Sequence, residues 1–561
     1  MNMKLIKSIM ISALALMLTS CLGDLNTLPL NDSDFTSEKA YEDEANYLKA
    51  LAYINGYYML VGQKEEGSND LGFNDSGQSE FMRQWWNMNE LSCDALKCTW
   101  TDSYVTGLQT NTWSDGENLA LTAVYTRAVK AIALVNEFLI QTESSKIESR
   151  GQGHLLETIA GYRAEARFHK AMFLYVLMDE FGNPPFPTTS NILNATNPEQ
   201  IKRADLFEWL ETELLDLASE SSAMPEFGEV PYPRPTKGAV WALLSRMYLN
   251  AEVYTGTARW QDAKDAAAEV IKMGYKLHDK YSDMFRQDNS TNGSAEEFVF
   301  AIAYDRDVTR SWGGSTTYTS ASLNSAVNEA LGKAFGMTKI NGENWDGYRV
   351  PDEYVKFFEL NGVEWGNADN AFGYDRETSD KRAFFTNFGN TTKNIDINIH
   401  EGNTTGWHCW KWCGLTSKDE FYQSEDAPGN WKLSSTDLAI FRLAELYLNY
   451  AEADARLNGG AVTDSKAKGY IKALRDRAGV GTPSEITLAW LLDERARELM
   501  WEGHRRVDLI RYGHFTSMNY PWPFKGGVAD GKVALGAHRT IYPLVATDIS
   551  ANNNLDQNPG Y

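Results

Sequence analysis

Four tryptophans lie in segments rich in glycine, asparagine and other polar residues, where packing into a core is a less natural role for an indole ring. They are Trp100, Trp113, Trp312 and Trp345, among 17 tryptophans in the chain. Flat aromatic faces cover the C–H face of a sugar ring, and polar side chains bind the hydroxyl groups on its rim. These residue types therefore indicate carbohydrate recognition, although core or loop packing stays open for each ring.

The pair Gly313-Gly314 follows one of these tryptophans directly, in the run Ser311-Trp312-Gly313-Gly314. Glycine has no Cβ, so it lets another group approach the backbone closely. We therefore expect the ring of Trp312 to be uncovered and available to a ligand.

The sequence contains no recognisable catalytic motif. It has no G-x-S-x-G, H-E-x-x-H, P-loop or dinucleotide-binding pattern. Two carboxylates could serve a glycosidase, but among 76 Asp and Glu residues such a pair has no specificity. We expect a protein that is not an enzyme, with a surface glycosidase as the remaining catalytic alternative.

Metal and cofactor sites are not favoured either. After Cys21, the cysteines are Cys93, Cys98, Cys409 and Cys413. They could form disulfides in an oxidising compartment, and their spacing does not match the usual two-residue zinc knuckles. The run from Asp288 to Gly293 resembles the start of a calcium loop, but Val299 stands where the bidentate glutamate should be. We expect buried or paired cysteines, a polar turn, no metal and no cofactor.

Charged residues near the C-terminus follow helical i, i+3 and i+4 spacings, which are typical of structural ion pairs. They are Arg495, Arg497, Arg505, Arg506 and Arg511 with Glu494, Glu498 and Glu502. The formal net charge of −23 argues against nucleic-acid binding, which needs clustered Lys and Arg.

The first residues resemble a secretory signal peptide. Lys4 and Lys7 precede an apolar run at residues 9–18, and Leu18-Thr19-Ser20-Cys21 closes it like a bacterial lipobox. We predict a signal peptide at 1–20, a lipidated Cys21 with a polar tether to residue 34, and one body at 35–561. A secreted protein with an incidental cysteine is the alternative. No other apolar run reaches the roughly 20 residues that span a bilayer.

Helical periodicity predicts the elements that carry these residues. Apolar positions recur at helical spacing over residues 120–141, 162–181, 206–217, 238–254 and 260–273. Residues 285–432 lack such a pattern, so we expect mainly loops there, with a strand at 298–302. Binding groups commonly lie on loops held by a rigid frame.

A tetratricopeptide-like signature occurs twice. Trp241-x-x-Leu244-Ser245-x-x-Tyr248 is followed by small residues at Ala263 and Ala267, and Phe441-x-x-Ala444-Glu445-x-x-Leu448 leads into Ala451 and Ala455. Helix pairs of this kind stack because neither helix can bury its apolar stripe alone.

Motifs along nearly the whole chain resemble the SusD-like (RagB/SusD) outer-membrane glycan-binding lipoproteins. They are the lipobox Cys21, Asn89-Glu90-Leu91-Ser92 with Asp94, the stretch from Tyr162 to Phe168, the stretch from Phe181 to Phe186, Arg442-Leu443-Ala444-Glu445, Leu474-Arg475-Asp476-Arg477-Ala478, and the segment from Glu494 to Arg511.

The resemblance implies a mostly α fold, in which tetratricopeptide-like helix pairs form a scaffold with long irregular loops and a few short strands. Its N-terminal part would cover about 35–284, and its loop-rich C-terminal part about 285–561. The resemblance also implies a lipid anchor in the outer membrane at the cell surface. The implied partner is a SusC-like TonB-dependent transporter, over which the protein sits as a lid.

Comparison with the starch-binding prototype of that family implies the site residues. The aromatic platform falls on Trp100, Trp312 and Trp345, and the polar contacts fall on Asp75 and Arg83. The prototype has an aromatic residue where this chain has Cys98, and an asparagine where it has Ser103. Starch and another neutral oligosaccharide or polysaccharide therefore both stay open, and a peptide-capturing lid of the same family is the alternative function.

Overall fold

The computed structural model describes residues 37–62, 68–114, 118–358, 360, 380–398, 404–421 and 432–561. The predicted signal peptide, the lipidated Cys21 and the tether lie outside these residues, so those predictions stay sequence-based.

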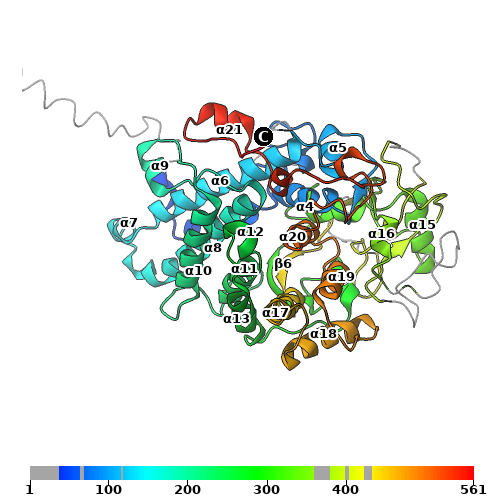
Figure 1. The fold of residues 1–561 in the computed structure, drawn as a ribbon. Helices are drawn as coiled ribbons and strands as arrows, with labels where there is room; N and C mark the ends of the chain where they lie inside the picture. The colour runs from blue at the N-terminus through cyan, green and yellow to red at the C-terminus, as the bar shows by residue number, and fades with distance from the viewer. Residues whose placement is uncertain are drawn as a thin grey trace, which may run out of the picture.

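The fold is mostly helical, as predicted (Figure 1). The α-helices are α2 (Ser37–Ala40), α3 (Ala45–Gly56), α4 (Phe81–Leu91), α5 (Ser103–Gln109), α6 (Leu119–Gln141), α7 (Ser144–Ser149), α8 (Leu156–Phe181), α9 (Thr189–Asn194), α10 (Arg203–Ala218), α11 (Lys237–Leu249), α12 (Ala251–Thr255), α13 (Trp260–Ile271), α14 (Gly314–Ser320), α15 (Ser325–Ala334), α16 (Asp352–Val355), α17 (Leu443–Leu457), α18 (Ser465–Ala478), α19 (Leu488–Glu498), α20 (Arg505–Arg511) and α21 (Ala546–Ala551).

Short strands complete the described part of the chain in three two-stranded antiparallel sheets. In these sheets β1 (Lys97–Cys98) pairs with β3 (Tyr348–Arg349), β2 (Phe298–Ile302) with β6 (Leu438–Arg442), and β4 (Phe385–Thr386) with β5 (His408–Cys409). The predicted strand at 298–302 is confirmed. Each pairing except the last joins segments far apart in the sequence.

Stacked helix pairs form the scaffold. Helix α6 packs on α8, α8 on α10, α10 on α11, α11 on α13, α13 on α17, and α17 on α18. The small residues of the repeat signature lie at one of these contacts. Ala263 and Ala267 are fully buried, and the hydroxyl of Ser245 donates a hydrogen bond to the carbonyl oxygen of Ala263 at 3.1 Å. The first copy of the signature therefore forms a closely packed helix pair.

The second copy is only partly helical. Phe441 lies in β6, and the helix that follows, α17, starts at Leu443. The prediction that Phe441 begins a helix is wrong because the chain there pairs with β2. The predicted helix at 238–254 is also interrupted, since Asn250 separates α11 from α12 and its side-chain amide donates to the carbonyl oxygen of Arg246 at 2.9 Å.

Helix α6 is the one helix among the described residues that is long and apolar enough to cross a membrane by length and composition. Most of it is buried against α8 and α4. Its apolar character therefore serves the core of the fold.

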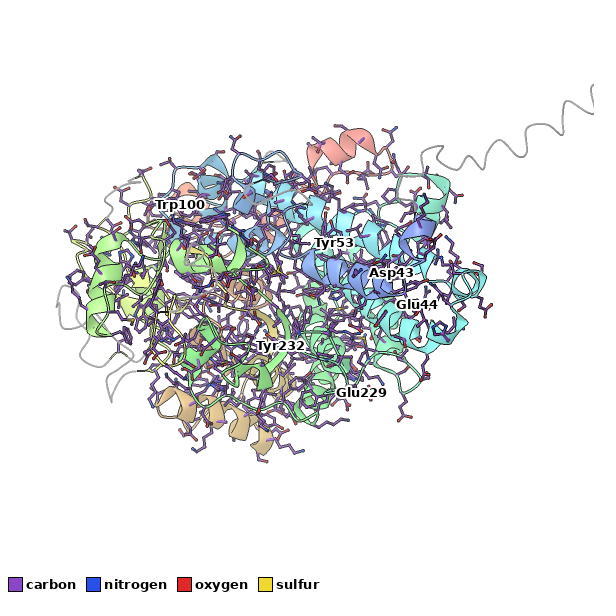
Figure 2. The ribbon with its side chains drawn as sticks, turned by 180° about the vertical axis from the view of Figure 1, so that it is seen from behind. Asp43, Glu44, Tyr53, Trp100, Glu229 and Tyr232 are labelled. Atoms are coloured by element: carbon purple, nitrogen blue, oxygen red, sulfur yellow. The ribbon has the colours of Figure 1, made fainter. Side chains whose placement is uncertain are left out.

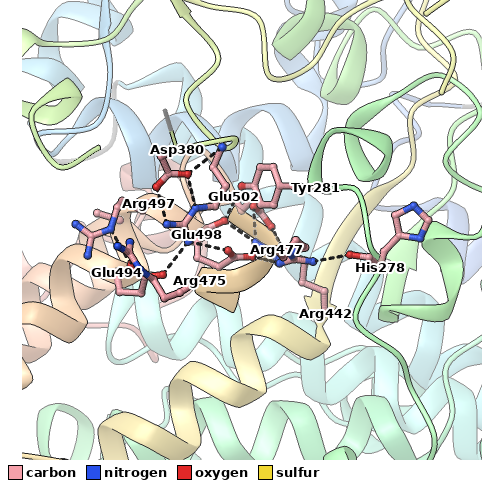
Figure 3. A network of polar contacts seen from close by, with 12 residues as sticks. His278, Tyr281, Asp380, Arg442, Arg475, Arg477, Glu494, Arg497, Glu498 and Glu502 are labelled. Atoms are coloured by element: carbon pink, nitrogen blue, oxygen red, sulfur yellow. Dashed lines mark hydrogen bonds and ion pairs between the residues drawn. The ribbon is translucent and has the colours of Figure 1, made fainter. Parts of the chain in front are cut away.

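The charged residues of the C-terminal segment form buried ion pairs, as predicted, but most partners come from other elements (Figure 3). Glu498 lies 2.7 Å from the guanidinium of Arg442 and 3.0 Å from that of Arg382, and it also pairs with Arg477. These arginines hold the pKa of Glu498 down at about 2, although burial alone would raise it. Two pairs in this segment use the i, i+3 spacing, Glu494 with Arg497 at 2.7 Å and Asp508 with Arg511 at 2.6 Å. The network joins α19 to β6, α18 and Arg382.

The cysteines and the calcium-like run have other roles. Cys93, Cys98, Cys409 and Cys413 are buried free thiols. The carboxylate of Asp288 accepts hydrogen bonds from the backbone and hydroxyl of Ser417 at 2.8 and 2.7 Å. No group of three potential ligands that could hold a metal ion occurs within the ranges that the structure describes.

Candidate functional site

The sheet of β1 and β3 fixes the geometry of the candidate site. Trp100 follows β1 and Trp345 precedes β3, and antiparallel pairing of Cys98 with Tyr348 brings these two ends together. The pairing continues past the strands, since the backbone N–H of Thr99 donates to the carbonyl oxygen of Gly347 at 2.9 Å. Residues 245 positions apart in the sequence therefore become neighbours.

The five predicted site residues line one pocket with a volume of about 260 Å³. Its lining consists of Asp75, Gln78, Arg83, Trp100, Asp102, Trp312 and Trp345. The residues come from the turn of 3-10 helix Ser76–Ser79, from α4, from both sides of the β1–β3 sheet and from the segment before α14. Both the N-terminal part and the loop-rich segment therefore contribute residues to the pocket.

Three indole rings form the aromatic wall. The ring centroids of Trp312 and Trp345 are 6.4 Å apart with planes 29° from parallel, and those of Trp345 and Trp100 are 6.5 Å apart with planes tilted by 47°. The planes of neighbouring rings are therefore not parallel.

The rings lie at different depths. Trp312 and Trp345 are half-buried, whereas Trp100 is only 9% exposed. The indole N–H of Trp100 donates to the carbonyl oxygen of Trp345 at 3.0 Å, and a Cβ added at Gly347 would lie 2.4 Å from its ring. Gly347 therefore allows Trp100 to lie directly on the backbone. Trp100 therefore packs largely against the protein itself, although packing was the less natural expectation for this ring.

Asp75 and Arg83 form the polar wall. The side chain of Arg83 is 3% exposed, and its Nη1 lies 3.3 Å from Oδ2 of Asp75, whose side chain is 46% exposed. Burial lowers the pKa of Arg83, but Tyr104 and Asp75 outweigh this effect and raise the pKa above its ordinary value. The guanidinium is therefore a fixed charge that orients the carboxylate toward the pocket.

Glu80 joins the two walls beneath the pocket. It is fully buried at the start of α4 and accepts hydrogen bonds from the hydroxyl groups of Ser311 and Tyr304. Burial raises the pKa of Glu80 to about 7, and these two hydroxyl groups partly offset the rise. Ser311 immediately precedes Trp312, so this carboxyl positions that indole ring relative to Arg83 on α4.

The role expected of Trp113 is wrong, and so is the role expected of the glycine pair after Trp312. Trp113 is 2% exposed, and its indole N–H donates to the hydroxyl of Tyr561 at 2.8 Å, so it packs in the core and not in the pocket. A Cβ at Gly313 would lie within 2.7 Å of Glu80, and one at Gly314 would collide with Tyr304. The glycine pair therefore makes room for buried side chains of the protein, and not for a ligand over Trp312.

Gln78 and Asp102 line the pocket but were not predicted. Both lie close in sequence to predicted residues, three positions after Asp75 and two after Trp100. This closeness in sequence to Asp75 and Trp100 was the signal that could have identified them. Cys98 and Ser103, where the sequence departs from the starch-binding prototype, are not among the lining residues.

The fold and the site together place the chain in the class of helical proteins with an aromatic-lined pocket. Residues 296–561 match the family model described as "SusD family", and residues 32–249 match the model described as "Starch-binding associating with outer membrane". The starch-binding protein SusD of Bacteroides thetaiotaomicron is 32% identical over 597 residues, covering 100% of both chains. The chain belongs to the SusD family.

More distant relatives agree with this assignment. SusD-like protein P25 of Formosa agariphila is 26% identical over 382 residues, which cover 62% of this chain and 63% of that protein. Surface glycan-binding protein A of Bacteroides thetaiotaomicron, solved with laminarihexaose, has a TM-score of 0.64 at 19% identity and covers 92% of this chain and 99% of its own. A laminarin-binding SusD-like protein has a TM-score of 0.65 at 18% identity, covering 93% and 100%. At these identities the two solved structures show the shared fold.

Proposed function

We propose that this chain binds a glycan at the cell surface through the pocket lined by Trp100, Trp312 and Trp345, and that starch or another α-glucan is its ligand. The observation that carries the proposal is the convergence of three indole rings and the Asp75–Arg83 pair on one pocket. Indole faces match the C–H faces of sugar rings, and a carboxylate with a guanidinium matches the donors and acceptors of vicinal hydroxyl groups.

The full-length similarity to a starch-binding protein favours an α-glucan. Laminarin-binding proteins of the same fold make a β-glucan the alternative that an experiment must separate.

The proposed role is capture without hydrolysis. Three stacking contacts at about 0.5–1.5 kcal/mol each contribute roughly 2–4 kcal/mol, and a millimolar dissociation constant corresponds to about 4 kcal/mol. Affinity of that order suits a protein that retains a polymer through many surface copies and then releases it.

The delivery step involves the membrane. A lipid on Cys21 would hold the protein at the outer membrane, and a SusC-like TonB-dependent transporter would receive the glycan beneath it. The lipobox and the family description, which names association with the outer membrane, support this part. Labelling cells with radioactive palmitate checks it, because Cys21→Ala should remove the label and release the protein from membranes. Co-purification of the transporter with the tagged protein tests the partnership.

Affinity electrophoresis tests the ligand. Soluble starch in the gel should slow the wild-type protein, laminarin should slow it less, and the variant Trp312→Ala/Trp345→Ala should migrate as in a plain gel. Retardation by laminarin alone would replace the α-glucan with a β-glucan, and retardation by neither would remove both. Release of reducing ends from starch by the purified protein would contradict a role limited to binding.

A further inference from the structure

The pocket exposes negative charge. Of its described lining residues, Asp75 has a side chain that is 46% exposed and Asp102 is exposed, whereas the cation Arg83 is 3% exposed. Each oxygen of Asp75 has one partner within the protein, since Oδ1 accepts from the backbone N–H of Gly77 at 2.9 Å and Oδ2 accepts from Nη1 of Arg83 at 3.3 Å. Arg83 therefore compensates one of the two carboxylates.

Asp102 is not compensated in the same way. It stands at the N-cap of α5, where an aspartate commonly accepts a hydrogen bond from the first turn, but its side chain accepts no capping bond. No ion pair between described residues includes it. Its carboxylate instead lines the pocket two residues from Trp100. A charge in this position acts on whatever enters the pocket.

We propose that Asp102 makes this pocket selective for uncharged glycans and excludes glycans that carry carboxylate or sulfate groups. The inference rests on the proposed function and adds the ligand class and the residue that sets it. An uncharged sugar can donate its hydroxyl hydrogens to the carboxylate, whereas an anionic group meets a like charge that repels it, most strongly at low ionic strength.

The first test measures the electrostatic potential at the pocket in the absence of a glycan. Iodide, an anion, and acrylamide, which is neutral, both quench indole fluorescence, so the ratio of their quenching constants reports local charge. The contribution of the two pocket tryptophans is obtained by subtracting the fluorescence of the Trp312→Phe/Trp345→Phe variant from that of the unsubstituted protein. At low ionic strength, Asp102→Asn should raise the iodide-to-acrylamide ratio by about 1.5- to 2-fold. At about 1 M salt, where the screening length is about 3 Å, the effect should vanish.

The second test compares soluble starch, hydroxyethyl starch and carboxymethyl starch as ligands. The hydroxyethyl derivative controls for bulk, since it is neutral. Wild-type protein should bind carboxymethyl starch about tenfold more weakly than hydroxyethyl starch, and Asp102→Asn should remove most of that difference. Asp43→Asn is the matched control because it removes an exposed carboxylate at the other end of the molecule from Trp100 (Figure 2).

The two tests separate the two claims. An iodide ratio that Asp102→Asn leaves unchanged overturns the charge selectivity, whatever glycan binds. Equal binding of the carboxymethyl and hydroxyethyl derivatives overturns it as well. A raised iodide ratio together with no binding of any starch supports the charged pocket and contradicts the α-glucan proposal.

Discussion

At the scale of single residues, the three indole rings differ in what they do for the fold. Trp345 and Trp312 are half-buried, so part of each side chain remains available to a ligand. Trp100 is 9% exposed, packs against Tyr348 with ring centroids 5.3 Å apart, and lies over Gly347. Replacing Trp312 or Trp345 should therefore mainly weaken ligand binding, whereas replacing Trp100 should mainly lower the stability of the fold.

Trp345→Ala should weaken binding of soluble starch by about 2- to 10-fold, the equivalent of one stacking contact. Its melting temperature should stay close to that of the wild type because the ring is half-buried. Trp100→Ala should lower the free energy of unfolding by about 3 kcal/mol or more, since it empties a buried site. Isothermal titration and thermal unfolding distinguish the two. Equal melting temperatures for both variants would contradict the difference in depth.

Gly347→Ala tests how Trp100 is positioned. The added Cβ would lie 2.4 Å from the indole, so the ring must move and the wall must change shape. We expect about tenfold weaker starch binding and a shifted tryptophan emission spectrum. Gly153→Ala is the control, because nothing lies within 4 Å of its Cβ position. Wild-type affinity in Gly347→Ala would show that the position of the Trp100 ring does not affect ligand binding.

At the scale of elements, periodicity predicted the long helices because their partners lie on neighbouring helices and impose a regular apolar stripe. It missed α14 and α15 in the segment expected to be loops. Helix α14 starts with Gly314 and is made of small and hydroxylated residues, and it is buried on all sides, so no amphipathic pattern appears. Helix α15 spans only Ser325–Ala334.

The local sequence alone singled out Trp100, Trp312 and Trp345, whereas Asp75 and Arg83 were predicted only through the resemblance to the family. Trp100 and Trp345 meet because β1 pairs with β3, and each of these strands is two residues long. No local pattern reveals a pairing between such short strands. Gln78 and Asp102 were missed because their position depends on the same long-range contacts.

Glu80 provides a prediction at this scale, because its carboxyl joins α4 to the segment that carries Trp312. Glu80→Gln should keep starch affinity within about threefold, since the amide oxygen still accepts a hydroxyl and the amide N–H can donate to the other. Glu80→Ala leaves Ser311 and Tyr304 without that partner, and we expect about tenfold weaker binding. Titration with starch and the melting temperature of each variant distinguish a displaced Trp312 ring from a general loss of stability. Wild-type binding by Glu80→Ala would refute the link.

At the scale of the whole molecule, buried ionisable groups fall into two kinds. Glu498 has arginine partners that keep it charged, and its pKa is about 2. Glu90 is fully buried, and burial is the largest influence on it, raising its pKa to about 8. The first kind ties elements together, whereas the second kind makes folding depend on pH.

Glu90→Gln should reveal this dependence. The folded protein holds the proton of Glu90 more tightly than the unfolded chain, whose pKa is near 4.5. Its contribution to stability is therefore complete below about pH 4.5 and is lost as the pH rises through about 8. Glutamine mimics the protonated form, so the stability of Glu90→Gln relative to wild type should increase by on the order of 3 kcal/mol from pH 5 to pH 8.

Denaturant unfolding at pH 5, 6.5 and 8 measures this difference. Glu498→Gln is the matched control, because the carboxylate of Glu498 stays charged over this whole range, so the variant lacks the arginine pairs at every pH tested. It should be destabilised by about 3–5 kcal/mol at all three values. A pH-independent difference between Glu90→Gln and wild type would mean that Glu90 is charged in the folded protein. In that case Lys411 and the backbone N–H of Gly503, which act against the effect of burial, would outweigh it.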